Sequence, residues 1–396
     1  VDMYVKCGVL AKAQEVHEEI PVRDVISWNS LIAGYAHQGY YRDAFHCFEQ
    51  MQVENLFPDG ITFKCILKAC GKTGAAVKGK LIHMYIMSRG LIEKDISVCH
   101  ALVEMYANCG MVAKAQKVLE DLPVQDTFTW NTVIAGYMKR EQGQEALNCF
   151  EWMENEGLSP DVFTIISALE ACSKIGAIKR GKQIHESVLN RCFLDKNVAL
   201  GTTLVNMYAK WGMLEKAQQV LEELPVQEIV SLNALISGYV QHRKYHEALT
   251  SFESVQSRGF TPDPITFFCI LKACANEGAI EKGKQIHDEI ASRGLLENDL
   301  MLGHALVNMY AKCGALAKAR KVLEELTMRD VVDWNALITG YILHGQSNEA
   351  LNCFEQMQSE GLSPNIVTFI CILKACGIRG AIQKGKQIHD EILRRG

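Results

Sequence analysis

Proline is scarce in this chain, with 8 residues in 396. Because proline breaks helix interiors, its confinement to a few joints leaves the stretches between them free to form helices. Runs of 18 or more apolar residues are also missing, so the sequence predicts no membrane-spanning helix. Half of the prolines recur in one local pattern, at Pro58-Asp59, Pro160-Asp161, Pro262-Asp263 and Pro364-Asn365.

The motifs that carry common enzyme chemistry are missing as well. The sequence contains no Cys-x-x-Cys, no Pro-Cys, no nucleophile elbow and no glycine-rich phosphate loop. His-x-Glu occurs at His17, His287 and His389, but a zinc deaminase also needs Pro-Cys-x-x-Cys to hold its metal. We therefore expect no catalytic residue, no metal and no cofactor in this stretch of chain.

Charge and cysteine usage bear on two further classes of protein. The formal charge of −5 and the pI near 6.2 run against nucleic-acid binding, for which a basic domain is the usual footprint. Cysteine is a small, readily buried residue, and periodic cysteines indicate structural thiols in a reducing compartment rather than disulfides. Among the 15 cysteines, the same two helix positions recur at Cys65/Cys70, Cys269/Cys274 and Cys371/Cys376.

What the sequence does contain is a period of 102 residues. Asn29, Asn131, Asn233 and Asn335 keep this step, and tryptophan precedes three of them. A single globular core has no reason to keep such a register. Helical repeats that bury their apolar faces against their neighbours need it at every joint. The sequence therefore predicts an α-helical solenoid.

Each period divides into three helix pairs of 35, 36 and 31 residues. Apolar side chains recur at three- and four-residue steps in both halves of each pair, as in amphipathic helices. The result is one array of ten full and two partial repeats, so we expect the chain to open and close within a repeat. The 35-residue repeats are 25–59, 127–161, 229–263 and 331–365; the 36-residue repeats are 60–95, 162–197, 264–299 and a partial 366–396; the 31-residue repeats are a partial 1–24, 96–126, 198–228 and 300–330.

The repeats carry the pattern VxxWNxLIAGY, with Pro-Asp at their ends. These residues resemble the pentatricopeptide repeat family, and the alternation of lengths resembles its P, L and S subtypes, as in plant organelle RNA-editing factors. The segments LVNMYAKCG and KGKQIH fit the S and L subtypes. Peptide-binding tetratricopeptide repeats carry a different pattern. The resemblance covers the whole chain and implies an all-α fold, a right-handed α-solenoid superhelix of helix-turn-helix repeats.

The resemblance also implies that RNA is read one base per repeat, by the fifth and the last residue. An Asn amide offers a donor and an acceptor, while a carboxylate accepts from N3–H of uracil and repels the lone pair at N3 of cytosine. Asn at the last position restores a donor and favours cytosine. The alternative is that the last residue serves only as a helix N-cap. The pairs in the 35-residue repeats are Asn29/Asp59, Asn131/Asp161, Asn233/Asp263 and Asn335/Asn365.

The other repeats are less regular. In two of the 31-residue repeats the fifth residue is a histidine, and no second potential metal ligand recurs beside it in the sequence. This pattern indicates a surface or base-contacting residue rather than a metal ligand. Thr202/Glu228 resembles the family's purine-reading pairs, whereas His100/Asp126 and His304/Asp330 depart from its common pairs and receive no base. The 36-residue repeats, expected to space the RNA or to hold a partner protein, have Lys64, Ile166, Phe268 and Ile370 at the fifth position.

Two further sets of residues follow from the resemblance. The second residue of a repeat packs against base faces, a contact that tolerates any sequence, although ordinary core between repeats is an alternative. The predicted stacking residues are Ile26, Ile61, Phe128, Phe163, Val230, Ile265, Val332 and Val367. Phosphate contacts are predicted for Lys72, Lys139, Lys174, Lys210 and Lys312 near the ends of first helices. Acidic pairs such as Glu222-Glu223 fall on second helices, and such a division gives a basic groove on an acidic protein.

These expectations combine into one hypothesis. The chain is a sequence-specific module for single-stranded RNA, the specificity part of a mitochondrial or chloroplast RNA-processing factor that acts in C-to-U editing. An editing accessory protein is expected on the 36-residue repeats, and no membrane or small-molecule partner. The predicted target is 5′-U-N-N-U-N-R-U-N-N-(C/U)-3′, where R is a purine. The alternatives are a protein- or peptide-binding scaffold and the specificity part of an RNA stability or splicing factor.

Overall fold

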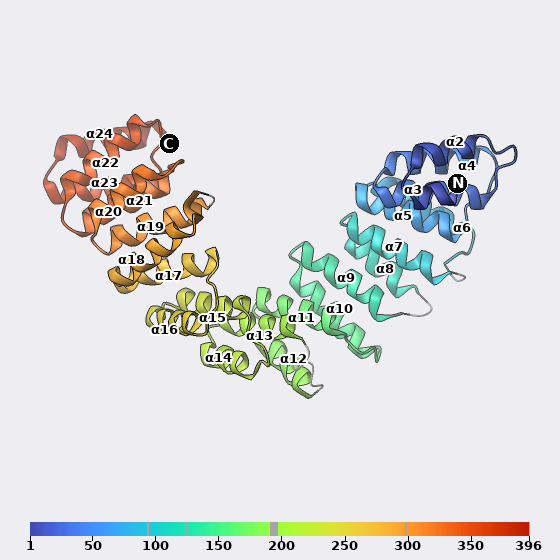
Figure 1. Cartoon of the computed structure of the whole chain (residues 1–396), viewed down its shortest axis with the longest axis horizontal. Helices are drawn as coiled ribbons and strands as arrows, with labels where there is room; N and C mark the ends of the chain where they lie inside the picture. Colours follow the sequence, from blue (N-terminus) through green and yellow to red (C-terminus); the bar gives the residue numbers. More distant parts are fainter. Residues whose placement is uncertain (93–94, 123–124, 191–196, 298, 396) are drawn as a thin grey trace. The chain divides into compact units, whose positions relative to one another are not determined.

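The computed structural model describes residues 1–92, 95–122, 125–190, 197–297 and 299–395. In these ranges every regular element is a helix, which confirms the predicted all-α fold (Figure 1). The chain divides into two compact units, the N-terminal unit (residues 1–191) and the C-terminal unit (residues 192–396). None of the helices described is both long enough and apolar enough to cross a membrane.

The helices alternate along the chain as first and second members of hairpins. In the N-terminal unit they are α1 (Asp2–Lys6), α2 (Leu10–Glu18), α3 (Val25–Gln38), α4 (Tyr41–Val53), α5 (Gly60–Thr73), α6 (Ala76–Ser88), α7 (Ile96–Asn108), α8 (Val112–Glu120), α9 (Thr127–Lys139), α10 (Gly143–Asn155), α11 (Val162–Ile175) and α12 (Ile178–Asn190). In the C-terminal unit they are α13 (Val198–Lys210), α14 (Leu214–Glu223), α15 (Ile229–Gln241), α16 (Tyr245–Ser257), α17 (Pro264–Glu277), α18 (Ile280–Ser292), the 3-10 turn η2 (Leu295–Glu297), α19 (Leu300–Lys312), α20 (Leu316–Glu325), α21 (Val331–Leu343), α22 (Ser347–Ser359), α23 (Ile366–Arg379) and α24 (Ile382–Arg395).

Within each unit the helices form two layers. The odd-numbered first helices pack on one another in sequence, from α3 to α11 and from α13 to α23. Each even-numbered second helix packs on its own first helix, and α4 also packs on α5, the first helix of the next repeat, as do its counterparts within each unit. Each repeat therefore buries its apolar faces against its sequence neighbours, which is the packing of a solenoid.

Local sequence sets the ends of the first helices. Asp59 precedes α5 and accepts hydrogen bonds from the backbone N–H groups of Ile61 and Thr62, while the Thr62 hydroxyl accepts from the backbone N–H of Asp59. This reciprocal capping box satisfies donors that a helix start otherwise leaves unpaired. At the other end, Gly74 adopts a left-handed φ of 69°, a conformation that glycine reaches without strain. The same cap ends α11, α17 and α23.

The core repeats with the 102-residue period. Trp28, Trp130 and Trp334 are buried, and Leu232 fills the equivalent place in the third period. Loss of one such tryptophan side chain costs about 3–5 kcal/mol in a well-packed core. The cysteines that the structure describes are free thiols. Burial raises the pKa of Cys149 to about 12, so this thiol stays neutral and packs as a small apolar side chain.

Glycine permits the closest approach of first helices in the C-terminal unit. A Cβ atom at Gly340 of α21 would lie 2.8 Å from Cβ of Ala311 in α19 and 2.9 Å from the Ala311 carbonyl oxygen. Gly238 of α15 meets Ala209 of α13 in the same way, at 2.6 Å. By contrast, nothing lies within 4 Å of a Cβ atom built at Gly377 of α23. In the C-terminal unit, glycine at the same position of two successive periods thus limits the spacing between α13 and α15 and between α19 and α21.

Candidate RNA-binding face

Asn29 connects two neighbouring repeats. It is the fifth residue of α3, and its Nδ2 lies 2.9 Å from each carboxylate oxygen of Asp59, the N-cap of α5. Its Oδ1 accepts a hydrogen bond of 2.6 Å from the Thr62 hydroxyl. Because a carboxylate only accepts and the amide oxygen cannot donate, these partners fix which way the amide faces.

The same arrangement recurs at the 102-residue step. Nδ2 of Asn131 donates to Asp161 at 2.9 Å, and Oδ1 accepts from the Thr164 hydroxyl at 2.5 Å. The third copy joins Asn233, Asp263 and Thr266 with distances of 2.9 and 2.6 Å. The amide donor of each Asn therefore faces a carboxylate, and its acceptor is occupied by a hydroxyl.

The fourth copy differs because Asn365 replaces the aspartate. Nδ2 of Asn335 donates to Oδ1 of Asn365 at 3.1 Å. The Thr368 hydroxyl bonds to Oδ1 of Asn365, also at 3.1 Å. Oδ1 of Asn335 is buried and has no hydrogen-bond partner in the part of the chain that the structure describes. The amide oxygen of Asn335 therefore stays without a hydrogen bond, whereas in the other three copies the amide oxygen accepts one from a threonine hydroxyl.

Burial of these side chains differs from the sequence-based expectation of an open row of amides. Asn29, Asn233 and Asn335 are only 6%, 8% and 7% exposed, and Asn131 is half-buried. The joint between repeats closes over these side chains, and their hydrogen bonds to the next repeat offset the cost of burying an amide. The expectation that each Asn presents both a donor and an acceptor therefore fails for the first three copies. What remains is the second N–H of Nδ2, together with the neighbouring carboxylate.

The last residue of each 35-residue repeat does serve as an N-cap, but it also accepts a hydrogen bond from the fifth-residue Asn of its own repeat. Burial alone would raise the pKa of Asp161, but hydrogen bonds from Thr164 and Asn131 outweigh it and hold this pKa below its usual value. The carboxylate is therefore ionised at neutral pH and acts purely as an acceptor. Capping engages mainly one oxygen, Oδ1, while Oδ2 faces Asn131.

The 31-residue repeats form different pairs. His100 Nε2 lies 3.1 Å from Oδ2 of Asp126, and its ring centroid is 5.7 Å from that of Phe128. No hydrogen bond joins Thr202 to Glu228 among the described residues. His304 is paired with Asp333, at 3.4 Å between Nε2 and Oδ2, whereas the sequence paired it with Asp330.

The predicted stacking residues share one environment. All eight are exposed, by between 52% and 73% of their surface, in the first turn of a first helix. The alternative that they form ordinary core between repeats is therefore wrong. They are Ile26, Ile61, Phe128, Phe163, Val230, Ile265, Val332 and Val367.

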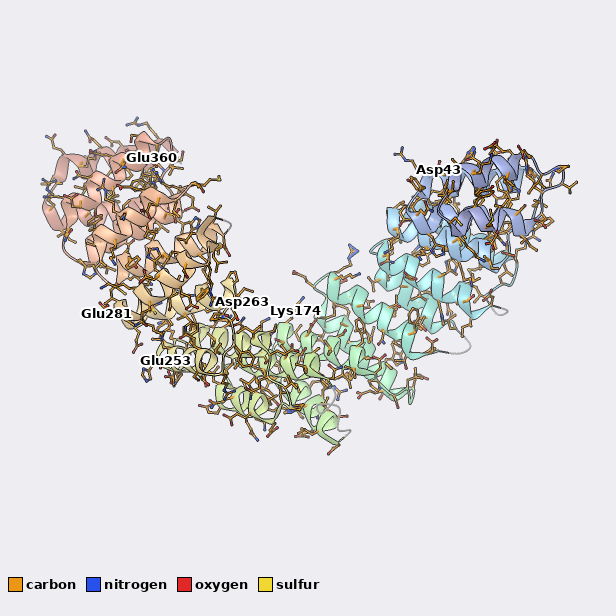
Figure 2. The ribbon with its side chains drawn as sticks, in the orientation of Figure 1. Asp43, Lys174, Glu253, Asp263, Glu281 and Glu360 are labelled. Carbon is orange, nitrogen blue, oxygen red and sulfur yellow. The ribbon has the colours of Figure 1, made fainter. Side chains whose placement is uncertain are left out.

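The predicted phosphate residues are exposed lysines in the last turns of first helices, where a positive charge also complements the helix dipole. They are Lys72, Lys139, Lys174, Lys210 and Lys312. Lys174 is marked at the end of α11 in Figure 2. In the C-terminal unit, Glu253 of α16 and Glu281 of α18 project from the second-helix side, whereas Asp263 lies on the other side (Figure 2).

One groove in the N-terminal unit brings the predicted roles together. It has a volume of about 560 Å³ and is lined by Phe128, Asn131, Lys139 and Phe163. Phe128 and Phe163 are the second residues of consecutive repeats, Asn131 is a fifth residue, and Lys139 ends the helix. Arg140 adds a second cation to the lining. The groove thus offers aromatic faces, an amide edge and positive charge within one space.

Two kinds of residue at this face were missed by sequence reasoning. The threonines that hold the Asn amides stand three residues after the last residue of each 35-residue repeat, and they recur at 102 residues. That period was the signal that could have found them. Arg140 stands beside Lys139, but the other periods have Gln38, His242 and His344 at its position. The threonines that hold the Asn amides are Thr62, Thr164, Thr266 and Thr368.

Comparison with known proteins finds repeat matches along the chain and relatives that cover nearly all of it. Residues 23–72, 125–174, 227–276 and 329–377 match the PPR repeat family, and residues 202–228 and 304–331 match the PPR repeat. A chloroplastic pentatricopeptide repeat-containing protein of Arabidopsis thaliana is 35% identical over 384 residues, which are 97% of this chain and 47% of that protein. A mitochondrial one from the same plant is 32% identical over 393 residues, 99% of this chain and 38% of that protein. The chain thus spans less than half the length of either relative.

Solved structures resemble the fold. The crystal structure of the pentatricopeptide repeat protein PPR10 in complex with an 18-nt psaJ RNA element has a TM-score of 0.75, with 18% identity over 98% of this chain and 58% of that one. PPR10 from maize has a TM-score of 0.64, with 19% identity over 99% of this chain and 62% of that one. At this level of identity the likeness establishes the solenoid fold.

Proposed function

Because the chain belongs to the pentatricopeptide repeat family, we propose that it binds single-stranded RNA along the face formed by its first helices. The groove at Phe128, Asn131, Lys139 and Phe163 carries this proposal, since it gathers the predicted stacking, reading and phosphate residues in one space. In this arrangement one nucleotide meets each reading pair, in the order of the repeats along the chain.

Stacking supplies affinity without sequence preference. The exposed side chains of Phe128 and Phe163 present apolar surface that a base covers when it enters the groove. Stacking of a base on an aromatic ring contributes about 1–3 kcal/mol. In the other 35- and 36-residue repeats Ile or Val takes this place, so we expect the repeats around Phe128 and Phe163 to contribute most to affinity.

Base preference follows from the hydrogen-bonding capacity that the Asn–Asp pairs retain. At Asn131/Asp161, the second N–H of Nδ2 donates to a carbonyl oxygen of uracil, while the Asp161 carboxylate accepts from N3–H. Cytosine places a lone pair at N3 against the same carboxylate and is disfavoured. Asn29/Asp59 and Asn233/Asp263 have the same capacity.

The pair Asn335/Asn365 has the opposite capacity. The unpartnered Oδ1 of Asn335 accepts from the amino group of cytosine, and Nδ2 of Asn365 donates to N3. With Thr202/Glu228 assigned to a purine, the array specifies 5′-U-N-N-U-N-R-U-N-N-(C/U)-3′. The pairs His100/Asp126 and His304/Asp330 receive no base.

The exposed lysines at the ends of first helices provide contacts to phosphates. Their row has gaps, with His37, Asn108 and Gln241 at equivalent positions. Few phosphate contacts mean that salt weakens binding only moderately. Acidic pairs on second helices, such as Glu222-Glu223 of α14, contribute to the negative net charge, while Glu104 of first helix α7 also lines the groove beside Lys139.

At the level of the whole protein, we propose that this stretch is the sequence-reading part of a mitochondrial or chloroplast RNA-processing factor that acts in C-to-U editing. The two relatives named above, one chloroplastic and one mitochondrial, support the organelle. Catalysis then belongs to other parts of the protein or to a partner. Three of the four 36-residue repeats carry a half-buried or exposed apolar side chain at the fifth position, namely Ile166, Phe268 and Ile370. The 36-residue repeats are the proposed contact for an accessory protein.

Selection from a randomised RNA pool tests the proposal. Enriched RNAs should carry U at the first, fourth and seventh positions of a ten-nucleotide site. In gel shifts, Asn131→Thr should lose the preference for U at the fourth nucleotide only. An Asn131→Thr variant with unchanged preference, or a chain without measurable RNA affinity, would contradict the proposed reading.

Lys210→Ala provides the matched comparison, because Lys210 is predicted to contact phosphate alone. It should weaken all RNAs about equally and reduce the slope of log K against log salt by about 0.7, the value per phosphate on a single strand. A change in sequence preference would exclude a pure phosphate role for Lys210.

A further inference from the structure

Three potential metal ligands meet at the joint between α19 and α21. His304 is the fifth residue of α19, Asp330 is the N-cap of α21, and Asp333 is the third residue of α21. One donor atom from each residue lies within 4.8 Å of the other two. Nε2 of His304 and Oδ2 of Asp333 are 3.4 Å apart.

Asp333 is the unusual member of this cluster. It is 1% exposed, and its Oδ1 is buried without a hydrogen-bond partner among the residues described. Oδ2 accepts one hydrogen bond of 3.0 Å from the backbone N–H of Asp330. A buried carboxylate is costly unless it is paired or binds a metal. Burial accordingly raises the pKa of Asp333 to about 6, and a bound cation would reverse that effect.

The other periods show that the fold does not require a carboxylate here. The equivalent residues are Ser27, Thr129 and Ser231, and Ser27 and Ser231 complete the capping box with a hydroxyl. Asp333 makes the same backbone contact but adds a buried negative charge. The fold does not require the histidine either, because the fifth residue of the 31-residue repeats is His at 100 and 304 but Thr at 202. Among the described residues, His304 is the histidine that meets two carboxylates, those of Asp330 and Asp333.

We propose that His304, Asp330 and Asp333 bind a divalent transition-metal ion of the Zn²⁺ or Mn²⁺ class. One imidazole nitrogen and two carboxylate oxygens form a ligand set that such ions accept, with water in the remaining positions. Two ligands that each lie about 2.1 Å from a tetrahedral ion are about 3.4 Å apart. The separation of His304 and Asp333 matches this value without rearrangement.

The remaining ligand and the route of entry also fit. Oδ1 of Asp330 accepts from the backbone N–H groups of Val332 and Asp333, which leaves the second oxygen of this carboxylate for the ion. Asp330 is exposed and His304 is half-buried, so an ion reaches the site directly from solvent. The three residues thus extend from the surface to the core, with the fully buried ligand innermost.

Metal titration without RNA tests this site independently of RNA recognition. Mn²⁺ is the suitable probe because the many thiols of this chain prefer softer ions, and its free-ion signal in electron paramagnetic resonance disappears on binding. We expect one Mn²⁺ per chain, displaced by Zn²⁺. Asp333→Ser, which installs the residue found at position 231, should weaken binding by more than about tenfold, the loss typical even for outer-shell partners. His304→Gln should do the same.

The chain supplies its own controls. His100→Gln should leave Mn²⁺ binding unchanged, because His100 faces Asp126 and the residue equivalent to Asp333 in that period is Thr129 rather than a second carboxylate. Thr129→Asp should add a second site and raise the stoichiometry from one to two. Absence of stoichiometric binding in the unaltered chain, or unchanged affinity in a folded Asp333→Ser variant, would overturn the assignment. Circular dichroism of each variant establishes that it is folded.

Discussion

Gly340→Ala tests whether close approach of first helices sets the packing of the stack. The new Cβ atom would lie 2.8 Å from Cβ of Ala311 and 2.9 Å from its carbonyl oxygen. Carbon atoms in optimal contact are about 3.5–4.0 Å apart, so α19 and α21 must separate. Both neighbouring atoms belong to the backbone or to Cβ, and neither can move aside by changing a rotamer.

The expected magnitude combines two opposing effects. Overpacking of a core position costs about 1–3 kcal/mol, whereas replacing glycine by alanine in a helix interior stabilises by about 0.5–1 kcal/mol. Gly340→Ala should therefore lower the free energy of unfolding by roughly 0.5–2 kcal/mol. Gly377→Ala is the matched control, because its Cβ atom meets nothing within 4 Å. It should raise stability by about 0.5–1 kcal/mol.

Urea unfolding followed by circular dichroism measures both variants, and the midpoints are comparable as long as the slopes agree. The difference between the variants isolates the overpacking cost, since both gain the same helix propensity. Hydrogen exchange should show the loss of protection at Gly340→Ala concentrated in α19 and α21. The reasoning fails if Gly340→Ala is as stable as Gly377→Ala.

Other variants and conditions probe separate features. Phe128→Ala should weaken RNA binding by about 1–3 kcal/mol in fluorescence anisotropy, whereas Met84→Ala, also an exposed apolar side chain but on second helix α6, should not; equal losses would remove the stacking role. Burial lowers the pKa of His287, whose Nδ1 lies 2.9 Å from the Tyr310 hydroxyl. The depressed pKa contributes stability above about pH 6.5, the unfolded value, and that stability is lost as pH falls through the folded value. His287→Gln should therefore reduce the fall in Tm between about pH 7 and pH 5, and an identical pH profile would refute the assignment. Iodoacetamide should label Cys7 first among the described cysteines in peptide mass spectrometry, because it alone of them is exposed; faster labelling of a buried thiol would contradict the packing.

The fold could be predicted because its signals are periodic and local. The step from Trp28 to Trp130 already implies that both occupy the same place in a repeating core, where the structure buries them. Asp59 and Gly74 mark where α5 begins and ends through capping chemistry that depends on a few adjacent residues. Such signals need no knowledge of distant contacts.

The site could be predicted only in part. Periodicity indicates that Asn29 and Asn131 are equivalent, but it does not reveal that a threonine hydroxyl from the next repeat occupies the amide oxygen. Hydrophobicity alone likewise does not tell an exposed Phe128 from a core one, since both alternatives suit an apolar side chain. Asp333 was visible as a departure from Ser and Thr, yet its proximity to His304 depends on how two helices pack.

The hydroxyl of Thr164 belongs to two repeats at once. It completes the cap of α11 and also makes its shortest hydrogen bond, of 2.5 Å, to the amide oxygen of Asn131 in α9. Under the proposed base reading, an exchange of only residues 131 and 161 to change a nucleotide preference would leave this hydroxyl facing a side chain it was not matched to. A transplanted repeat would likewise keep its selectivity only when the neighbour on its C-terminal side provides the same threonine. For engineering, the unit to exchange is therefore the junction of two hairpins. Libraries should vary three positions together: the fifth residue of a repeat, its last residue and the threonine three residues further on.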